Sequence, residues 1–342
     1  MLDAMSLELR GRSGYVQNEI IETIYFGGGT PSLLLKEELS AFLAQIEELF
    51  EVSPNAEISL EANPDDCTEK NLKAWKSIGV NRLSIGIQSF KSSDLEWMNR
   101  AHNAKEAEQC VLLAQSIGYE NITVDLMYGL PGLSEEEWRN HIQKVIDWGV
   151  PHVSSYCLTV EENTLLERKV KSGELKVADN EEESRQFEIL LETLSQNGID
   201  QYEISNFSRP GFESRHNSNY WKGVHYLGIG PSAHSFQGTS RQWNIANNTQ
   251  YMKNVEEGTA FFELEVLSDS DRFNELILTG LRTVYGVSFE QLSDIQQIPS
   301  DFKVNIEKFI SQDWAEVKNE RIFLTKEGRL RADFIASELF IA

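Results

Sequence analysis

Short apolar runs alternate with helical patterns through residues 20–205 of the chain. Each run is bounded by glycine, proline or polar residues, which is typical of the buried strands of a β/α protein. This alternation restricts the fold to a β/α barrel or a doubly wound sheet, in which helices join parallel strands. The expected strands are 20–26, 57–62, 82–88, 122–128, 153–159 and 200–205, and the expected helices are 36–50, 69–77, 104–116, 134–148 and 182–196.

The C-terminal ends of these strands carry polar residues. In both fold classes the ligand lies at this end of the parallel strands, because the loops that follow them converge there. The sequence therefore predicts one ligand site lined by several strand ends. The residues expected there are Thr30, Glu61, Asn63, Gln88, Ser89, Asp125 and Tyr128.

Three consecutive glycines follow the first expected strand, in the segment FGGGTP at residues 26–31. Such a run costs backbone entropy, so it indicates a place where a ligand approaches the main chain closely. The segment has neither the lysine of a phosphate-binding loop nor the glycine spacing of a dinucleotide-binding loop. A tight turn between a strand and a helix is the structural alternative.

Composition excludes several classes of partner. The formal net charge of −23 argues against nucleic acid and anionic membranes, because phosphate binding requires a basic face. No apolar run has the length of a membrane span, and the N-terminus lacks the apolar core of a secretion signal. Cys67, Cys110 and Cys157 are widely spaced, which favours a reducing compartment over a disulfide framework. We therefore expect a cytoplasmic protein.

The pattern changes after residue 208. Residues 209–262 are rich in glycine, aromatic residues and histidine without clear periodicity, so we interpret them as a connecting segment. Residues 263–342 show helices, then a strand pair within WAEVKNERIFLT, then a last helix, an order similar to a winged helix. Acidic residues outnumber basic ones in this last part, which argues against DNA binding. The expected domains are 1–208, 209–262 and 263–342.

Motifs along nearly the whole chain resemble, in order and spacing, the radical S-adenosylmethionine enzymes. The likeness is to the oxygen-independent coproporphyrinogen III oxidase branch and, within it, to the HemW-type heme chaperones. It implies an α/β fold: a partial, open TIM-like β/α barrel that lacks its first strand, followed by a small winged-helix-like α+β domain. Besides FGGGTP, the motifs are LEANPDD (60–66), NRLSIGIQSF (81–90), NRAHNAKEA (99–107), VDLMYGLPG (124–132), YEISNFSRPG (202–211), RHNSNYW (215–221), YLGIGPSAHSF (226–236) and RFNELILTGLRT (272–283).

The resemblance implies a site for S-adenosylmethionine. In the family the glycine-rich strand end presents backbone groups to the methionine amino group, and Gly28, Gly29 and Thr30 occupy those positions here. Glu61 and Gln88 match residues placed around the cofactor. Arg100 matches the cation that faces the cofactor carboxylate, and Asp125 matches the acid that binds a ribose hydroxyl. A guanidinium suits a carboxylate, and an acid accepts hydrogen bonds from a diol.

The family's C-x-x-x-C-x-x-C loop, which holds a [4Fe–4S] cluster, has no counterpart in this sequence. The three cysteines do not form a cluster motif, and we expect them to be buried small side chains. Cys67 and Cys157 follow strands and could share a cavity, whereas Cys110 falls on an expected helix. The opening LDAMSLELRGR matches the family's first helix. We therefore expect a truncated, cluster-free chain, from a late start codon, a trimmed clone or a degenerate gene.

Two functions remain open within the family: heme delivery to acceptor proteins, or oxidative decarboxylation of coproporphyrinogen III. HNSNYW matches the H-N-x-x-Y-W pattern of the heme-binding branch, which makes His216, Asn217, Tyr220 and Trp221 the candidate heme site, with His216 as the iron ligand. Packing between domains is the structural alternative for these residues, and His234 is a second candidate ligand. A cluster-free carrier of a tetrapyrrole or a partner protein also remains open. The residues expected near the barrel mouth are Tyr156, Glu203, Asn206, Arg241 and Trp243.

Overall fold

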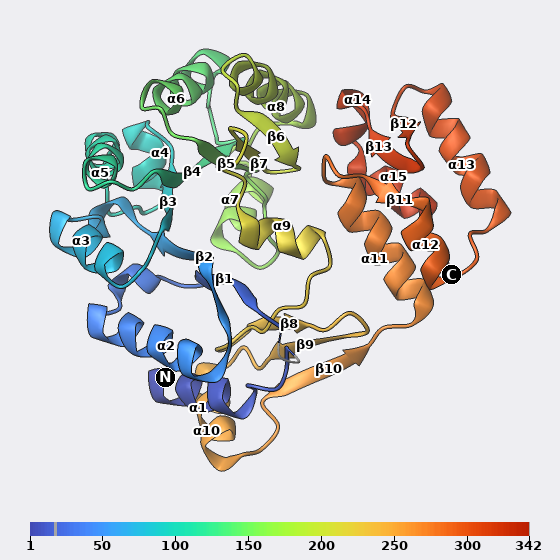
Figure 1. Cartoon of the computed structure of the whole chain (residues 1–342). Coiled ribbons are helices and arrows are strands. Elements are labelled where there is room, and N and C mark those ends of the chain that lie inside the picture. The colour runs from blue at the N-terminus through green and yellow to red at the C-terminus, as the bar shows by residue number, and fades with distance from the viewer. Residues whose placement is uncertain (17–18, 342) are drawn as a thin grey trace. The chain divides into compact units, whose positions relative to one another are not determined.

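The computed structural model describes residues 1–16 and 19–341, and its largest sheet has seven strands in the order β1-β2-β3-β4-β5-β7-β6 (Figure 1). The neighbours from β2 to β5 pair in parallel, as the alternation of strands and helices predicts. β1 lies at one edge, and among the described residues the sheet does not close, so the predicted open barrel is confirmed. The strands are β1 (Ile21–Phe26), β2 (Val52–Ala62), β3 (Arg82–Gln88), β4 (Asn121–Tyr128), β5 (His152–Cys157), β6 (Asp200–Glu203) and β7 (Asn206–Ser208).

The strand expected near residues 200–205 is present as β6, although it already ends at Glu203. A further short strand that the sequence does not predict, β7, follows it; β6 and β7 pair antiparallel, and β7 pairs antiparallel with β5. Only Ile204 and Ser205 separate β6 from β7. A connection this short can join only antiparallel neighbours, since a parallel pair needs a crossover of about a dozen residues or more.

The chain divides into two compact units. The barrel unit comprises Thr23–Lys36 and Glu57–Glu213, and the terminal unit comprises Met1–Glu22, Glu37–Ala56 and Ser214–Ala342. Each unit thus combines segments that are distant in the sequence. The domain boundaries expected at residues 208 and 262 stay predictions.

In the barrel unit, helices follow the parallel strands and lie along the outer side of the sheet, as Figure 1 shows for α3, α5, α6 and α8. Side chains that precede several of these helices cap their free backbone N–H groups; α5, α6 and α8 each begin with a full capping box. The helices are α3 (Glu69–Ser77), α4 (Ser92–Trp97), α5 (Ala104–Ser116), α6 (Glu135–Asp147), α7 (Leu165–Lys171) and α8 (Asn180–Ser195), with 3₁₀ turns η1 (Pro31–Leu33) and η2 (Pro64–Asp66).

The two faces of the sheet differ in chemistry. Leu83, Ile85 and Ile87 of β3 are fully buried, whereas Ser84, Gly86 and Gln88 alternate with them and point to the inner face. The interior of a closed TIM barrel is filled by branched apolar side chains. Small and polar residues on the inner face of this half-barrel instead leave a surface that can bind a polar ligand.

A buried polar layer crosses the N-terminal end of the inner face. Arg82 lies 3.7 Å from the Glu57 carboxylate and donates a hydrogen bond of 2.8 Å from Nη2 to Thr123. On β5, His152 shares a hydrogen bond of 2.8 Å with the Tyr202 hydroxyl. Burial lowers the pKa of His152 well below its ordinary value, and the Arg82 charge lowers it further, so the imidazole is neutral. Paired in this way, the buried polar groups close the bottom of the half-barrel and leave its C-terminal end for a ligand.

The terminal unit contains ordered structure where the sequence predicts only a connecting segment. The three strands of its first sheet pair antiparallel in the order β10-β9-β8. Helix α1 packs against α10, and the Glu8 carboxylate of α1 is fully buried. The absence of periodicity in residues 209–262 reflects very short elements. The bounds are α1 (Leu2–Gly11), α2 (Lys36–Leu49), α9 (Arg215–Trp221), β8 (His234–Phe236), β9 (Ser240–Asn244), α10 (Asn248–Glu257) and β10 (Phe262–Val266).

The last part of the terminal unit has the predicted winged-helix order of elements. A first helix precedes a short strand, two further helices follow, and a hairpin completes an antiparallel sheet with the order β11-β13-β12. A core of apolar side chains that includes Phe273, Phe302 and Phe309 holds these helices together. The elements are α11 (Asp269–Leu281), β11 (Val287–Ser288), α12 (Phe289–Ile295), α13 (Ser300–Ser311), β12 (Ala315–Lys318), β13 (Arg321–Leu324), α14 (Lys326–Arg329) and α15 (Ala332–Leu339).

Candidate functional site

The glycine run lies at the C-terminal end of β1, and glycine is required there for two reasons: backbone conformation at two positions and lack of space at the third. Gly28 and Gly29 have φ angles of +69° and +95°, which side chains disfavour. Gly27 is required by space: a Cβ atom there would lie 2.4 Å from Cε1 of Tyr25 and 2.7 Å from Oε1 of Glu61. Thr30 follows as an exposed residue at the start of η1. The run therefore presents bare backbone at a strand end.

Glu61, near the end of β2, fixes this backbone. Its Oε1 accepts a hydrogen bond of 2.7 Å from the Tyr25 hydroxyl, and its Oε2 accepts one of 3.2 Å from the Gly28 N–H. Burial raises the pKa of Tyr25, and the Glu61 carboxylate raises it further, so the phenol stays a hydrogen-bond donor. Tyr25 is a site residue that the sequence prediction missed, although it directly precedes FGGGTP on the strand.

Gln88 and Arg100 converge on the end of β3. The Arg100 Nη2 donates hydrogen bonds to the Gly86 carbonyl oxygen at 2.6 Å and to Asn63 Oδ1 at 2.9 Å. A Cβ atom on Gly86 would lie 3.1 Å from Gln88 Nε2 and 3.2 Å from Arg100 Nη2, so Gly86 leaves room for both side chains. Gln88 itself has a φ angle of +71°. A guanidinium and an amide thus meet at this strand end.

Asp125 lies on the inner face of β4, beside Gly86 of β3 and Ser154 of β5 in the strand register. It accepts a hydrogen bond of 3.2 Å from the Ser84 hydroxyl. Burial raises the pKa of Asp125 to about 7, and the negative charge of Glu61 adds to the rise. Ser84, which donates this hydrogen bond to Asp125, lies opposite Glu61 in the register of β2 and β3, so both carboxyl groups lie on the same part of the inner face.

The inner face continues across β5 to the antiparallel hairpin. The Tyr156 hydroxyl of β5 is partly removed from water, which raises its pKa to about 12, with smaller contributions from the negative charges of Asp125 and Glu203. The Asn206 amide donates a hydrogen bond to the Glu203 carboxylate. Asn206 is also the partner of Ser154 in the register between β7 and β5. These polar groups extend the same surface as Asp125.

The H-N-x-x-Y-W motif forms the seven-residue helix α9 in the terminal unit. His216 Nε2 lies 3.0 Å from the Tyr220 hydroxyl, one helical turn away, and the two rings meet edge-on. Burial lowers the pKa of His216 to about 4, so the imidazole is neutral near pH 7. Trp221 has the Arg282 guanidinium 6.0 Å from its ring centroid, and the Asn217 backbone N–H is capped by Ser214.

His234, Arg241 and Trp243 lie on the sheet of the terminal unit. His234 of β8 is exposed, and its ring centroid lies 6.4 Å from that of Trp243 on β9. Arg241 forms ion pairs with Glu265 and Glu275. The placement of Arg241 and Trp243 near the barrel mouth, and iron ligation by His234, stay predictions.

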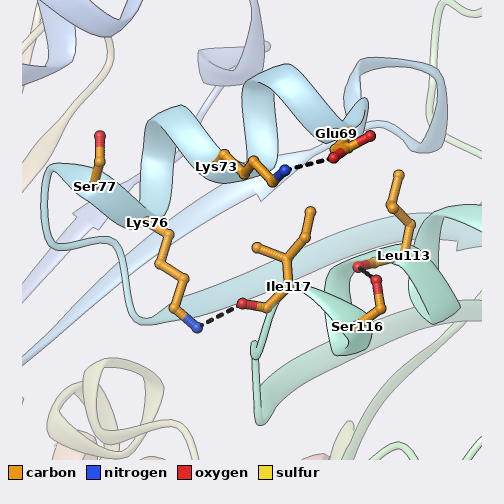
Figure 2. A pocket seen from close by; sticks show the side chains of 7 residues that line it. All are labelled: Glu69, Lys73, Lys76, Ser77, Leu113, Ser116 and Ile117. Atoms are coloured by element: carbon orange, nitrogen blue, oxygen red, sulfur yellow. Dashed lines mark hydrogen bonds and ion pairs between the residues drawn. The ribbon is translucent and has the colours of Figure 1, made fainter.

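A shallow pocket on the outer side of the barrel unit lies between α3 and α5 and is shown in Figure 2. Lys73 pairs with Glu69, and Lys76 donates hydrogen bonds to the carbonyl oxygens of Ile117 and Gly118 at 3.0 and 2.6 Å. Protein acceptors therefore already engage both cations. The strand ends, with their polar groups directed inward, remain the better candidate for a ligand site.

Comparison with known proteins places these features in a family. Residues 10–145 match the model of the radical SAM superfamily, and residues 267–331 match that of the HemN C-terminal domain. The heme chaperone HemW of Lactococcus lactis is 32% identical over 91% of this chain and 80% of its own length. HemW of Bacillus subtilis is also 32% identical, over 96% of this chain and 88% of its own length.

The chain belongs to the HemW family. Its fold agrees with that of the coproporphyrinogen III oxidase HemN of Escherichia coli, with a TM-score of 0.85, 22% identity, and coverage of 99% of this chain and 82% of HemN. At that identity the likeness establishes the fold alone. It confirms the predicted half-barrel of the radical SAM type.

The cysteines of this HemW-family chain do not match a cluster site. Cys67 is buried beside Cys110, because η2 packs against α5. A hydrogen bond with the Cys110 thiol raises the pKa of Cys67, and burial raises it further. Cys157 instead contacts Glu183, and its pKa rises to about 12 through burial. Among residues 1–16 and 19–341, no three His, Cys, Asp or Glu side chains converge on a possible metal position. These side chains do not fit a [4Fe–4S] cluster.

Proposed function

We propose that this chain binds heme through α9 of the terminal unit and passes it to acceptor proteins. The observation that carries this proposal is His216: an imidazole that burial keeps neutral, one turn from Tyr220 and on the same short helix as Trp221. A neutral imidazole is a good ligand for heme iron, and aromatic rings pack on the apolar face of a porphyrin. The name of the curated HemW relatives supports the same function. We infer that the protein acts in the cytoplasm, where its thiols stay reduced.

We further propose that the barrel unit holds S-adenosylmethionine at the strand ends. The Gly27–Gly29 backbone would accept close approach of the amino acid part, Arg100 would pair with its carboxylate, and Asp125 would bind a ribose hydroxyl. S-adenosylmethionine would supply a 5′-deoxyadenosyl radical only if it received one electron, and the described side chains do not fit the cluster that would donate it. The residues of this chain do the binding: Glu61 fixes the glycine backbone, and the Tyr25 phenol orients Glu61.

Oxidative decarboxylation of coproporphyrinogen III is the second candidate activity. It is favoured by the HemN-like fold, which is shared over nearly the whole chain. The heme chaperone function is the better supported of the two, because the HemW relatives match at higher identity and the heme motif forms a defined helix.

A heme titration tests the proposed function. We expect a Soret shift with the wild-type chain and roughly tenfold or weaker affinity for His216→Ala, because the variant loses the protein ligand of the iron. Tyr220→Phe is the matched control: it keeps the ring but removes the hydroxyl that now engages His216 Nε2, so its affinity should be equal or higher. Wild-type affinity should hold between pH 8 and 5, because the low pKa keeps His216 unprotonated. Equal heme affinity of wild type and His216→Ala would contradict the ligand assignment.

A further inference from the structure

An exposed lysine ends the helix that carries the proposed heme site. Lys222 directly follows α9, and its Nζ lies 4.7 Å from the centroid of the Tyr285 ring. The described part of the chain places no carboxylate at ion-pair distance from this ammonium. The Lys222 ammonium can therefore form an ion pair with an anionic ligand.

A second cation of this region is differently placed. Arg282 also lies over an aromatic ring, that of Trp221, but its Nε donates a hydrogen bond of 3.0 Å to Asp333. Its charge is thus compensated within the protein. The chain has a formal net charge of −23, so its surface is mostly negative. Lys222 therefore places a positive charge, unpaired within the described part of the chain, on an otherwise acidic protein.

Exposed apolar and aromatic side chains flank Lys222. Tyr220 and Val224, each two residues from Lys222, are 43% and 38% exposed. Tyr285, whose ring contacts the ammonium, is 36% exposed, and the preceding Val284 is also exposed. The Val224 N–H donates to the Asn219 carbonyl oxygen, which folds the chain back at the end of α9. We call four of these residues, Tyr220, Val224, Val284 and Tyr285, the α9 patch. A flat apolar ligand could pack on the α9 patch, and a carboxylate at the edge of that ligand could pair with the Lys222 ammonium.

We propose that Lys222 binds a propionate carboxylate of heme while the macrocycle lies on the α9 patch. This inference rests on the proposed function and adds to it the residue that selects for a carboxylate-bearing porphyrin. The ammonium would form a charge-assisted hydrogen bond with the propionate, and the Tyr285 ring holds it in place through a cation–π contact. A fixed ammonium loses less side-chain entropy on binding than a freely moving one.

Titrations with two porphyrins that differ only at the propionates test the proposal. We expect Lys222→Gln to bind heme about three- to tenfold more weakly than wild type, and Lys222→Glu more weakly still, because the propionate loses its cation or meets a like charge. Both variants should bind heme dimethyl ester as wild type does, because the esters carry no charge. Lys253→Gln, at an exposed position of α10, is the control for the loss of one positive charge elsewhere.

These titrations distinguish propionate binding by Lys222 from heme binding as such. If wild type binds heme and Lys222→Gln binds it equally well, the propionate assignment is wrong while the heme proposal stands. The same holds if Lys222→Gln weakens heme and its dimethyl ester equally, since the effect is then not on the propionate. If wild type binds neither porphyrin, the proposed function falls, and this inference with it. Equal melting temperatures of wild type and Lys222→Gln would confirm that folding is unchanged.

Discussion

The position of Asp125 favours ligand binding but disfavours ionisation of its carboxyl group. Its place on the inner face of β4 suits a hydrogen bond to a ligand hydroxyl, but the same place buries its carboxyl group near that of Glu61. Hydrogen bonds from Ser84 and Ser154 and the charge of Arg100 only partly offset this cost. The folded chain without a ligand therefore holds the carboxyl proton of Asp125 up to a pH of about 7.

Replacing Asp125 by asparagine should change the pH dependence of stability. Burial raises the pKa of Asp125 from 3.8 to about 7, so between these values the folded chain holds a proton that the unfolded chain has released. The contribution of Asp125 to stability therefore falls as the pH rises through this window and stays low above it. Relative to wild type, we expect the unfolding free energy of Asp125→Asn to be about 3 kcal/mol higher at pH 8 than at pH 5, because wild type loses about 1.4 kcal/mol for each pH unit between pH 5 and the folded pKa. Urea unfolding at both pH values measures this change.

The exposed residue Asp294 of α12 offers the control for that experiment. Asp294→Asn removes the same charge without a comparable burial, so its effect should be nearly the same at pH 5 and pH 8. An equal effect of Asp125→Asn at the two pH values would show that Asp125 is ionised throughout and that its surroundings are more hydrated than the structure indicates.

Site residues differ in how far the sequence predicts them. Glu61 and Gln88 end or nearly end parallel strands, and that position alone predicts that they share one end of the sheet. Asp125 lies within β4, so its place on the inner face follows from the alternation of side chains along the strand. Tyr25 and Gly86 were missed, because their roles depend on which side chain lies across the strand pair. The alternation of small and polar residues in RLSIGIQ was the available signal for Gly86.

At the scale of elements, α1 is held by one buried carboxylate. Glu8 accepts hydrogen bonds from the Gly230 N–H at 2.8 Å, from the Asn244 amide at 2.7 Å and from the Tyr251 hydroxyl at 2.5 Å. Arg12 of the following turn lies 3.1 Å away and neutralises the charge. Three elements of the terminal unit, namely α1, β9 and α10, thus meet at a single side chain.

Replacing Glu8 by glutamine should release α1 from this arrangement. The amide keeps the shape, but it removes the counter-charge of buried Arg12. Its NH2 group also replaces one carboxylate oxygen, so it meets the donor of either Asn244 or Tyr251, which bond different oxygens of Glu8. Breaking a buried pair by removing one partner costs about 3–5 kcal/mol. We expect a loss of this order in unfolding free energy, together with faster hydrogen exchange in α1.

Glu48→Gln is the matched control, because Glu48 pairs with Arg10 at the exposed surface of the same unit. Surface pairs contribute about 1 kcal/mol or less, so this variant should be nearly as stable as wild type. Similar losses for the two variants would mean that the Glu8 network does not hold α1 in solution.

The elements of the barrel unit were more predictable than those of the terminal unit. The expected bounds of β3, α3 and α5 agree with the structure, since regular periodicity and capping residues mark their ends. The strands β8 to β10 were missed. They are short, and contacts distant in the sequence, such as those of Glu8, determine their positions. Periodicity cannot reveal an element whose stability comes from such contacts.

At the scale of the whole molecule, negative charge dominates. The formal net charge is −23, and the winged-helix-like part shares the acidic excess, so this order of elements gives no basic surface for DNA. None of the described helices has both the length and the apolar composition to cross a membrane. Most ion pairs join exposed side chains, as Lys73–Glu69 and Arg10–Glu48 do, whereas Glu57–Arg82 is buried.

Salt should therefore stabilise this protein. Added salt screens two opposing effects: repulsion among the excess acidic groups, which destabilises the compact state, and attraction within surface ion pairs, which stabilises it. The pairs are individually weak, and the buried Glu57–Arg82 pair is little screened, so the relief of repulsion should prevail. We expect the melting temperature to rise by about 2 °C, or roughly 1 kcal/mol, between 10 and 200 mM NaCl. Calorimetry at a series of NaCl concentrations measures the shift, with equal osmolality of sucrose as a control for non-ionic effects. A melting temperature that falls with salt would mean that the surface ion pairs, rather than the net charge, govern the electrostatic stability of the fold.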